Sequence, residues 1–170
     1  MSEKKSYLEG KKILAVDDEK DILEIIEEKL EMADVDTALD YQTASEKISQ
    51  KKYDLAILDI MGVNGLNLLV EAVNKGIPTV MLTAHALNPE TLETSIKKGA
   101  LSFLPKEELP NLDEFLSEIL VTEKKGGSTW KLLFDRLGSF FEHHFDKNWM
   151  DDYPEIRQKY GQPGRWHERG

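Results

Sequence analysis

The sequence predicts an α/β fold: a doubly wound, five-stranded parallel sheet, with an amphipathic helix added at the C-terminal end. Five short apolar runs have the length of buried strands, and segments with apolar residues at helical spacing alternate with them. The alternation fills about 120 residues, the usual size of one such domain. The rest of the 170 residues leaves room for a tail rather than for a second large domain.

Each predicted strand is a short run that is apolar or nearly so. The five runs are Lys12–Val16, Val35–Leu39, Leu55–Leu58, Ile77–Leu82 and Ala100–Leu104. Continuous apolar runs are typical of strands that are buried on both faces of a parallel sheet. The second run is the weakest, because Asp34, Asp36 and Asp40 interrupt or flank it.

The segments that alternate with these runs have the spacing of amphipathic helices. They are 21–33, 44–51, 66–73, 91–98 and 112–121. In the first, Ile22, Ile26 and Leu30 recur four residues apart and therefore lie on one face. Gly76 and Gly99 follow the third and fourth segments, where a glycine commonly ends a helix.

The composition restricts the classes of function that are open to the chain. Lys and Arg number 22 against 32 Asp and Glu, a formal charge of -10, so we expect no binding to nucleic acid, whose phosphates an acidic protein repels. The absence of cysteine excludes disulfides, thiolate nucleophiles and cysteine-ligated metals. No stretch is apolar enough for a secretory signal or for membrane insertion, so we expect a cytoplasmic protein.

We expect four segments along the chain. They are an N-terminal extension (1–10), an α/β domain (11–122), a linker (123–128) and a C-terminal helical tail (129–170). Gly126 and Gly127 make the linker flexible. From Ser128 onward seven basic residues balance seven acidic ones, so the excess negative charge belongs to the α/β domain. A short, neutral tail does not suit a DNA-binding helix-turn-helix.

Charged and hydroxyl side chains follow four of the predicted strands. Asp17 and Asp18 close the first strand, Asp59 the third and Thr83 the fourth, and Lys106 lies just past the fifth. The carboxyl ends of parallel strands meet at one edge of the sheet, where these folds bind ligands. Converging carboxylates repel one another unless a cation joins them, and oxygen ligands favour Mg²⁺, Mn²⁺ or Ca²⁺. Each residue alone would more simply cap a helix, form a turn or stay solvated, but together they make Asp59 a candidate phosphoryl acceptor.

Four motifs resemble those of the bacterial response-regulator receiver domain, over about residues 10 to 122. They are VDDE at Val16–Glu19, LAILDIM at Leu55–Met61, PTVMLTA at Pro78–Ala84 and GALSFLPK at Gly99–Lys106. The resemblance implies a flavodoxin-like receiver fold and two-component signalling through protein contacts. It also implies that Asp59 takes a phosphoryl group from a histidine kinase or a phosphotransfer protein, and that the chain is not an enzyme in the usual sense.

The resemblance further assigns roles at the site. Asp18 would bind Mg²⁺ (or Mn²⁺) directly and Asp17 through water, with Asp59 and the backbone carbonyl of Met61 completing the protein ligands. A second set would respond to the phosphoryl group: Thr83 as the switch hydroxyl, Lys106 as its ion-pair partner, Phe103 as the aromatic switch residue, and His85 as a residue that tunes the phosphoryl lifetime.

Two departures from the family pattern leave alternatives open. Gly62 and Gly65 follow Asp59 with no proline, so the loop after the third strand looks about two residues short; Glu107 stands where the family has proline after the lysine, so we expect a trans Lys106–Glu107 bond. A degenerate receiver that acts as a scaffold is therefore one alternative. A small Mg²⁺-dependent phosphatase with an aspartate nucleophile is another, but Met61 stands where it would need a second acid.

The tail contains the clearest amphipathic stripe of the sequence. Its residues are Trp130, Leu133, Phe134, Leu137, Phe141 and Phe145. The stripe would either pack against the α/β domain of the same chain or form a contact with a second copy or a downstream protein. From Asp151 onward, prolines, glycines and charges predict an extended or partly disordered end, unless Tyr153, Tyr160 and Trp166 hold it in place.

Overall fold

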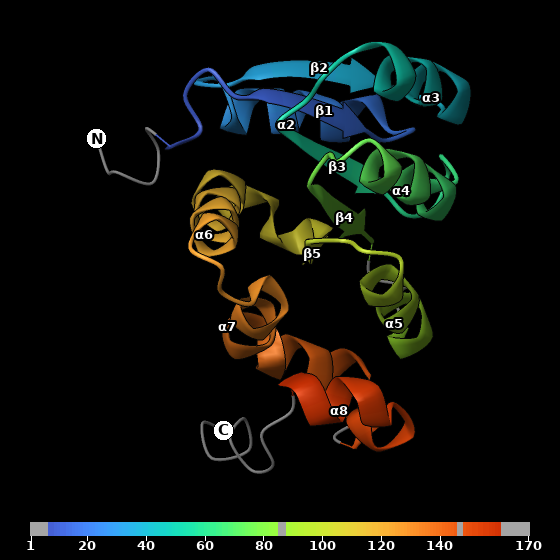
Figure 1. Ribbon diagram of the computed structural model, residues 1–170, viewed down its shortest axis with the longest axis vertical. Helices are drawn as coiled ribbons and strands as arrows, with labels where there is room; N and C mark the ends of the chain where they lie inside the picture. Colours follow the sequence, from blue (N-terminus) through green and yellow to red (C-terminus); the bar gives the residue numbers. More distant parts are fainter. Residues whose placement is uncertain (1–6, 85–87, 146–147, 161–170) are drawn as a thin grey trace.

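The computed structural model describes residues 7–84, 88–145 and 148–160, and it contains the predicted five-stranded parallel sheet (Figure 1). The strands are β1 (Lys12–Val16), β2 (Asp34–Ala38), β3 (Leu55–Asp59), β4 (Thr79–Thr83) and β5 (Ser102–Pro105). Their order across the sheet is β2-β1-β3-β4-β5, with every neighbouring pair parallel. The interior strands β3 and β4 are buried along their whole length, which explains their continuous apolar runs.

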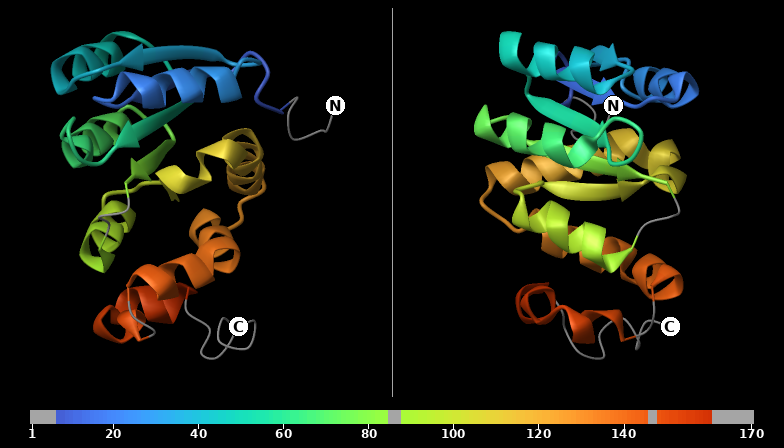
Figure 2. Two further views of the ribbon diagram at one scale, coloured as in Figure 1. Left: turned by 180° about the vertical axis from the view of Figure 1, so that it is seen from behind. Right: turned by 90° about the vertical axis from the view of Figure 1, so that its right-hand side faces the viewer.

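The helices cover both faces of the sheet, as the doubly wound prediction requires. They are α2 (Lys20–Lys29), α3 (Tyr41–Gln50), α4 (Gly65–Asn74), α5 (Pro89–Lys97) and α6 (Leu112–Lys124), with the short 3-10 helix η1 (Lys106–Asn111) before α6. Figure 2 shows α2 and α6 on one face and α3, α4 and α5 on the other. The fold class is therefore confirmed.

Several element ends differ from the prediction for local reasons. Helix α2 stops at Lys29 rather than Ala33, because Leu30 leaves helical geometry and donates its N–H to the carbonyl of Ile26 as a cap. Strand β2 forms in spite of its aspartates. Asp36 lies at the sheet edge and accepts hydrogen bonds from Lys47, Lys51 and Tyr53, which satisfy its charge there.

The C-terminal tail folds back onto the α/β domain. It contains α7 (Thr129–His144), the 3-10 helix η2 (Trp149–Asp152) and α8 (Pro154–Tyr160). Helix α7 lies beyond β5, next to the open edge of the sheet (Figure 1). Trp130 Nε1 donates to the carbonyl oxygen of Ala100 at 2.8 Å, and Thr129 Oγ1 donates to that of Leu101, so two side chains attach α7 to the segment that leads into β5.

The predicted stripe is buried inside this chain. Leu133, Phe134 and Phe141 have no exposed surface, and Trp149 of η2 closes the cluster with ring centroids 5.2 to 6.2 Å from those of Phe134, Phe141 and Phe145. In the structure the stripe therefore packs within its own chain rather than lying exposed for a second copy or a downstream protein. Helix α7 is kinked at Leu137, whose φ and ψ are -117° and 18°.

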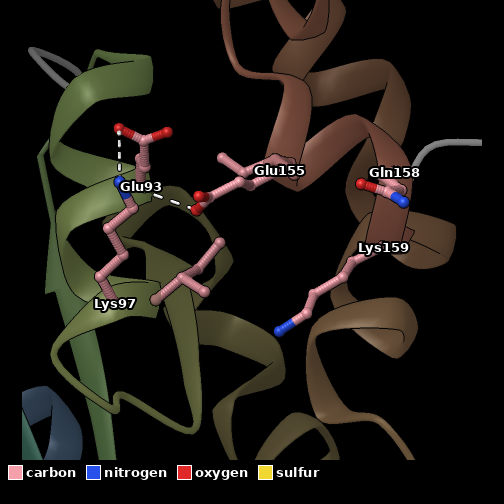
Figure 3. Close-up of a pocket in the computed structure, with 7 residues that line it drawn as sticks. Glu93, Lys97, Glu155, Gln158 and Lys159 are labelled. Carbon is pink, nitrogen blue, oxygen red and sulfur yellow. Dashed lines mark ion pairs between the residues drawn. The ribbon is translucent and has the colours of Figure 1, made fainter.

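The expectation of an extended chain beyond Asp151 is wrong for residues 154–160, which form α8. Pro154 stands at the helix start, where proline is tolerated, and Ile156 is only 3% exposed. Figure 3 shows Glu155 facing Lys97 of α5 across a cleft, with Nζ and Oε2 3.7 Å apart. Because that ion pair is exposed, burial of Ile156 contributes more to the docking of α8.

Within the described part of the chain, no helix combines the length and the apolar character needed to cross a membrane.

Candidate phosphoacceptor site

The sheet brings three carboxylates together at the carboxyl ends of β1 and β3. Val16 and Leu58 are register partners on these adjacent strands, so the next residues, Asp17 and Asp59, lie side by side. Asp18 follows in the β1–α2 loop. One oxygen of each carboxylate lies within 4.8 Å of the others, which is close enough for a single cation to contact all three.

Asp17 is the most enclosed of the three acids, with no exposed surface. Its Oδ1 accepts a hydrogen bond of 2.8 Å from the backbone N–H of Glu19. Its Oδ2 makes no well-directed hydrogen bond within the part of the chain that the structure describes, although Lys106 Nζ lies 3.0 Å away. Burial raises the pKa of Asp17, and an under-coordinated buried oxygen of this kind is suited to a cation.

Asp59 is 4% exposed and lies at the end of the central strand. Burial, followed by the negative charge of Asp17, raises the pKa of Asp59 to about 7. The ammonium of Lys106 opposes this increase, with Nζ 3.5 Å from Asp59 Oδ1. The site therefore holds more negative charge than its own lysine neutralises, and all its acidic donors are oxygens, so its donor set fits a hard divalent cation such as Mg²⁺.

Lys106 enters the site from the end of β5. Besides Asp17 and Asp59, its Nζ lies 3.1 Å from Glu19 Oε2. Burial alone would lower the pKa of Lys106, but the neighbouring carboxylates of Asp17 and Glu19 raise it above the ordinary value, so the side chain is a fixed cation. The peptide bond between Lys106 and Glu107 is trans, as the missing proline predicts.

Glu19 is an additional residue of the site, for which the VDDE motif predicts no role. It is 62% exposed at its side chain, and its partnership with Lys106 depends on a contact between residues 87 positions apart. Only the tertiary fold brings the ends of β1 and β5 close enough for that contact.

The other site residues expected from the resemblance are Thr83, Phe103, Met61 and His85. Thr83 ends β4, beside β3, and its Oγ1 donates to the carbonyl of Ala84 at 3.0 Å. Phe103 is fully buried in β5. Met61 has a side chain that is 72% exposed, and its carbonyl accepts from the N–H of Val63 at 2.9 Å, which leaves one lone pair for a ligand. His85 lies outside the described residues.

The β3–α4 loop is compact and depends on two glycines. Gly65 begins α4 directly against β3, and a Cβ there would lie 2.0 Å from the carbonyl oxygen of Asp59. Gly62 has a φ of +77°, and Asn64 adopts a left-handed φ of 55°. This geometry keeps the loop close to the carboxylates of Asp18 and Asp59.

Residues 13–118 match the model of the response regulator receiver domain family. The chain therefore belongs to this family. A comparison with curated proteins found no match.

Solved structures of response regulators and their receiver domains resemble this chain. A CheY-like receiver domain protein from Methanospirillum hungatei JF-1 is 28% identical with a TM-score of 0.62, over 69% of this chain and 99% of that one. A two-component response regulator from Clostridium difficile is 27% identical with a TM-score of 0.59, over 65% and 95%. A Francisella response regulator receiver domain is 27% identical with a TM-score of 0.58, over 68% and 99%. The chain is thus a receiver domain of two-component signalling with additional C-terminal residues.

Proposed function

We propose that Asp59 is the phosphoacceptor of this receiver domain, with Asp17, Asp18, Asp59 and the carbonyl of Met61 holding Mg²⁺ or Mn²⁺. The observation that carries the proposal is the convergence of three carboxylates and one buried ammonium at a single sheet edge. A cation would neutralise the excess negative charge and draw the oxygens of an incoming phosphoryl group toward Asp59.

In the transfer step, a carboxylate oxygen of Asp59 attacks phosphorus while the P–N bond to the donor histidine breaks. The electron pair of that bond stays on the imidazole nitrogen, and an aspartyl phosphate forms. Lys106 stays charged and can pair with a phosphoryl oxygen, since its Nζ is already 3.5 Å from Asp59 Oδ1.

Thr83 would report the phosphoryl group. Its hydroxyl now donates to the neighbouring carbonyl of Ala84, and rotation about one side-chain bond would exchange that acceptor for a phosphoryl oxygen. Phe103 in β5 would follow as the aromatic switch residue, and His85 would affect the phosphoryl lifetime. These roles make the chain a signalling module rather than an enzyme with a turned-over substrate.

The partners we propose are a histidine kinase or phosphotransfer protein in the cytoplasm and a downstream protein. Self-association through the aromatic stripe would require α7 to leave β5, because Phe134 and Phe141 are buried there. The downstream contact therefore uses the outer surface of the domain or of the docked tail. The acidic charge of -10 disfavours a nucleic-acid target.

Intact-protein mass spectrometry after incubation with acetyl phosphate and Mg²⁺ tests the proposal, with Asp59→Asn as the control. We expect one phosphoryl adduct in the wild-type protein and none in the variant. A folded wild-type protein that takes no phosphoryl group from acetyl phosphate or from a phosphorylated donor protein would contradict the proposal and favour the scaffold alternative, for which the shortened loop is the supporting observation.

A further inference from the structure

Gly62 lies directly beneath the carboxylate of Asp18. A Cβ placed on Gly62 would lie 2.6 Å from Oδ2, 2.7 Å from Cγ and 2.8 Å from Oδ1 of Asp18. Real Cβ atoms essentially never approach another heavy atom closer than 3.0 Å. The space that a side chain would fill at residue 62 is therefore the space in which the Asp18 carboxylate lies.

Little else determines the direction of the Asp18 side chain. Among the described residues its carboxylate has no hydrogen bond or ion pair, and the side chain is exposed. Asp17 differs in both respects, since it is enclosed and accepts from the N–H of Glu19. An exposed acid without such partners can rotate away from a neighbour at small cost, but that rotation would remove its oxygen from the three-carboxylate group.

We propose that Gly62 is a positioning residue that keeps open the place from which Asp18 contacts the metal ion. The inference rests on the proposed function, because it assigns Asp18 to the cation. It depends on the β3–α4 loop, which places residue 62 against the Asp18 carboxylate. A side chain at residue 62 would displace Asp18 and weaken cation binding, while Asp59 and Lys106 would stay in place.

A simpler explanation for the glycine is its backbone, because a φ of +77° favours glycine whatever lies nearby. Gly76 separates the two explanations. Its φ is +75°, and a Cβ there would meet nothing within 4 Å. Gly76→Ala therefore carries the same backbone penalty as Gly62→Ala without any contact to the site.

The first measurement is Mn²⁺ binding to the full chain, followed by the electron paramagnetic resonance signal of free aqueous Mn²⁺. We expect Gly62→Ala to weaken binding by about tenfold or more, as loss of ligand orientation does in metal sites, and Gly76→Ala to stay within about twofold of the wild type. The second is the rate of phosphorylation by acetyl phosphate against Mg²⁺ concentration. Gly62→Ala should need more Mg²⁺ for its half-maximal rate but approach the wild-type rate at saturation.

A double-mutant cycle with Asp18→Ala shows whether Gly62 acts through Asp18. If it does, adding Gly62→Ala to Asp18→Ala has no further effect on Mn²⁺ affinity. The double variants Asp18→Ala/Gly62→Ala and Asp18→Ala/Gly76→Ala should then have the same melting temperature. Because Asp18→Ala also removes the clash, the cycle remains informative if Gly62→Ala alone folds poorly.

Three results are distinguishable. The positioning role would be overturned, and the proposed function left intact, if Gly62→Ala bound Mn²⁺ as tightly as the wild type. The same conclusion would follow if Gly62→Ala and Gly76→Ala lost equal amounts of Mn²⁺ affinity. An additive effect in the Asp18→Ala background would overturn it as well. A wild-type protein that binds no Mn²⁺ and takes no phosphoryl group would overturn the proposed function itself.

Discussion

Removing one hydrogen bond between α7 and the segment that leads into β5 tests whether this bond attaches the tail to the α/β domain. Trp130→Phe keeps an aromatic ring in a site that is 6% exposed but deletes the N–H that donates to the carbonyl of Ala100 at 2.8 Å. A buried hydrogen bond contributes about 1 kcal/mol net, and a carbonyl left without a donor adds about 1–3 kcal/mol of desolvation. We expect the free energy of unfolding to fall by about 2 kcal/mol in addition to the loss of ring area.

Trp149→Phe is the matched control. Trp149 is also buried, at 4% exposed, and packs in the same aromatic cluster, but the structure gives it no side-chain hydrogen bond among the described residues. Both variants lose the same part of an indole ring, so the difference between them isolates the bond to Ala100. Urea unfolding followed by far-ultraviolet circular dichroism measures both without depending on tryptophan emission. If the free energy of unfolding fell equally in the two variants, the attachment of α7 through Trp130 would be refuted.

Three further predictions concern β2, β5 and the tail. Burial alone would raise the pKa of Asp36, but hydrogen bonds from Lys47, Tyr53 and Lys51 lower it to about 2. Because the pKa of Asp36 is lower in the folded state, its carboxylate stabilises the fold by at most about 2 kcal/mol above the unfolded-state pKa of 3.8. This stabilisation is lost as the pH falls toward 2. The difference in free energy of unfolding between the wild type and Asp36→Asn, measured in urea, should therefore shrink over that interval. Ser102 Oγ is buried and has no hydrogen-bond partner among the described residues, so Ser102→Ala should leave the melting temperature unchanged or raise it; a lower melting temperature would contradict the prediction. A chain ending at Lys125 should still take a phosphoryl group on Asp59 but should self-associate in size-exclusion chromatography, because it uncovers apolar surface and the β5 edge.

The sheet and the carboxylate cluster could be predicted from the sequence because each depends on a local pattern and one topological rule. Apolar runs such as 55–58 predict buried strands, and parallel strands bring residues that follow them to one edge. The aspartates of β2 weakened that prediction because the partners of Asp36 come from elsewhere in the chain: Lys47 and Lys51 on and after α3, and Tyr53 before β3. The residues next to Asp36 in the sequence do not indicate these partners.

Other features depend on distances that no local pattern specifies. The approach of Gly62 to Asp18 joins two loops that follow different strands, and only the packing of β1 against β3 brings them together. Helix α8 is short and has one deeply buried residue, Ile156, whose environment includes Ile96 of α5. A seven-residue segment rich in charge is marginal as an isolated helix, so its structure depends on this docking, and composition alone predicted an extended chain.

Strand β5 is where the candidate site and the tail contact the same element. At its C-terminal end Lys106 reaches Asp59, and just before its N-terminal end the carbonyls of Ala100 and Leu101 accept hydrogen bonds from α7. Among the described strands, β5 is the last of the sheet and pairs with β4 alone, which would otherwise leave one side of its backbone open. Helix α7 lies beyond that side, where a sixth strand would pair (Figure 1). The aromatic stripe, for which the sequence left a partner contact open, thus protects the edge strand that directly precedes the site lysine, Lys106.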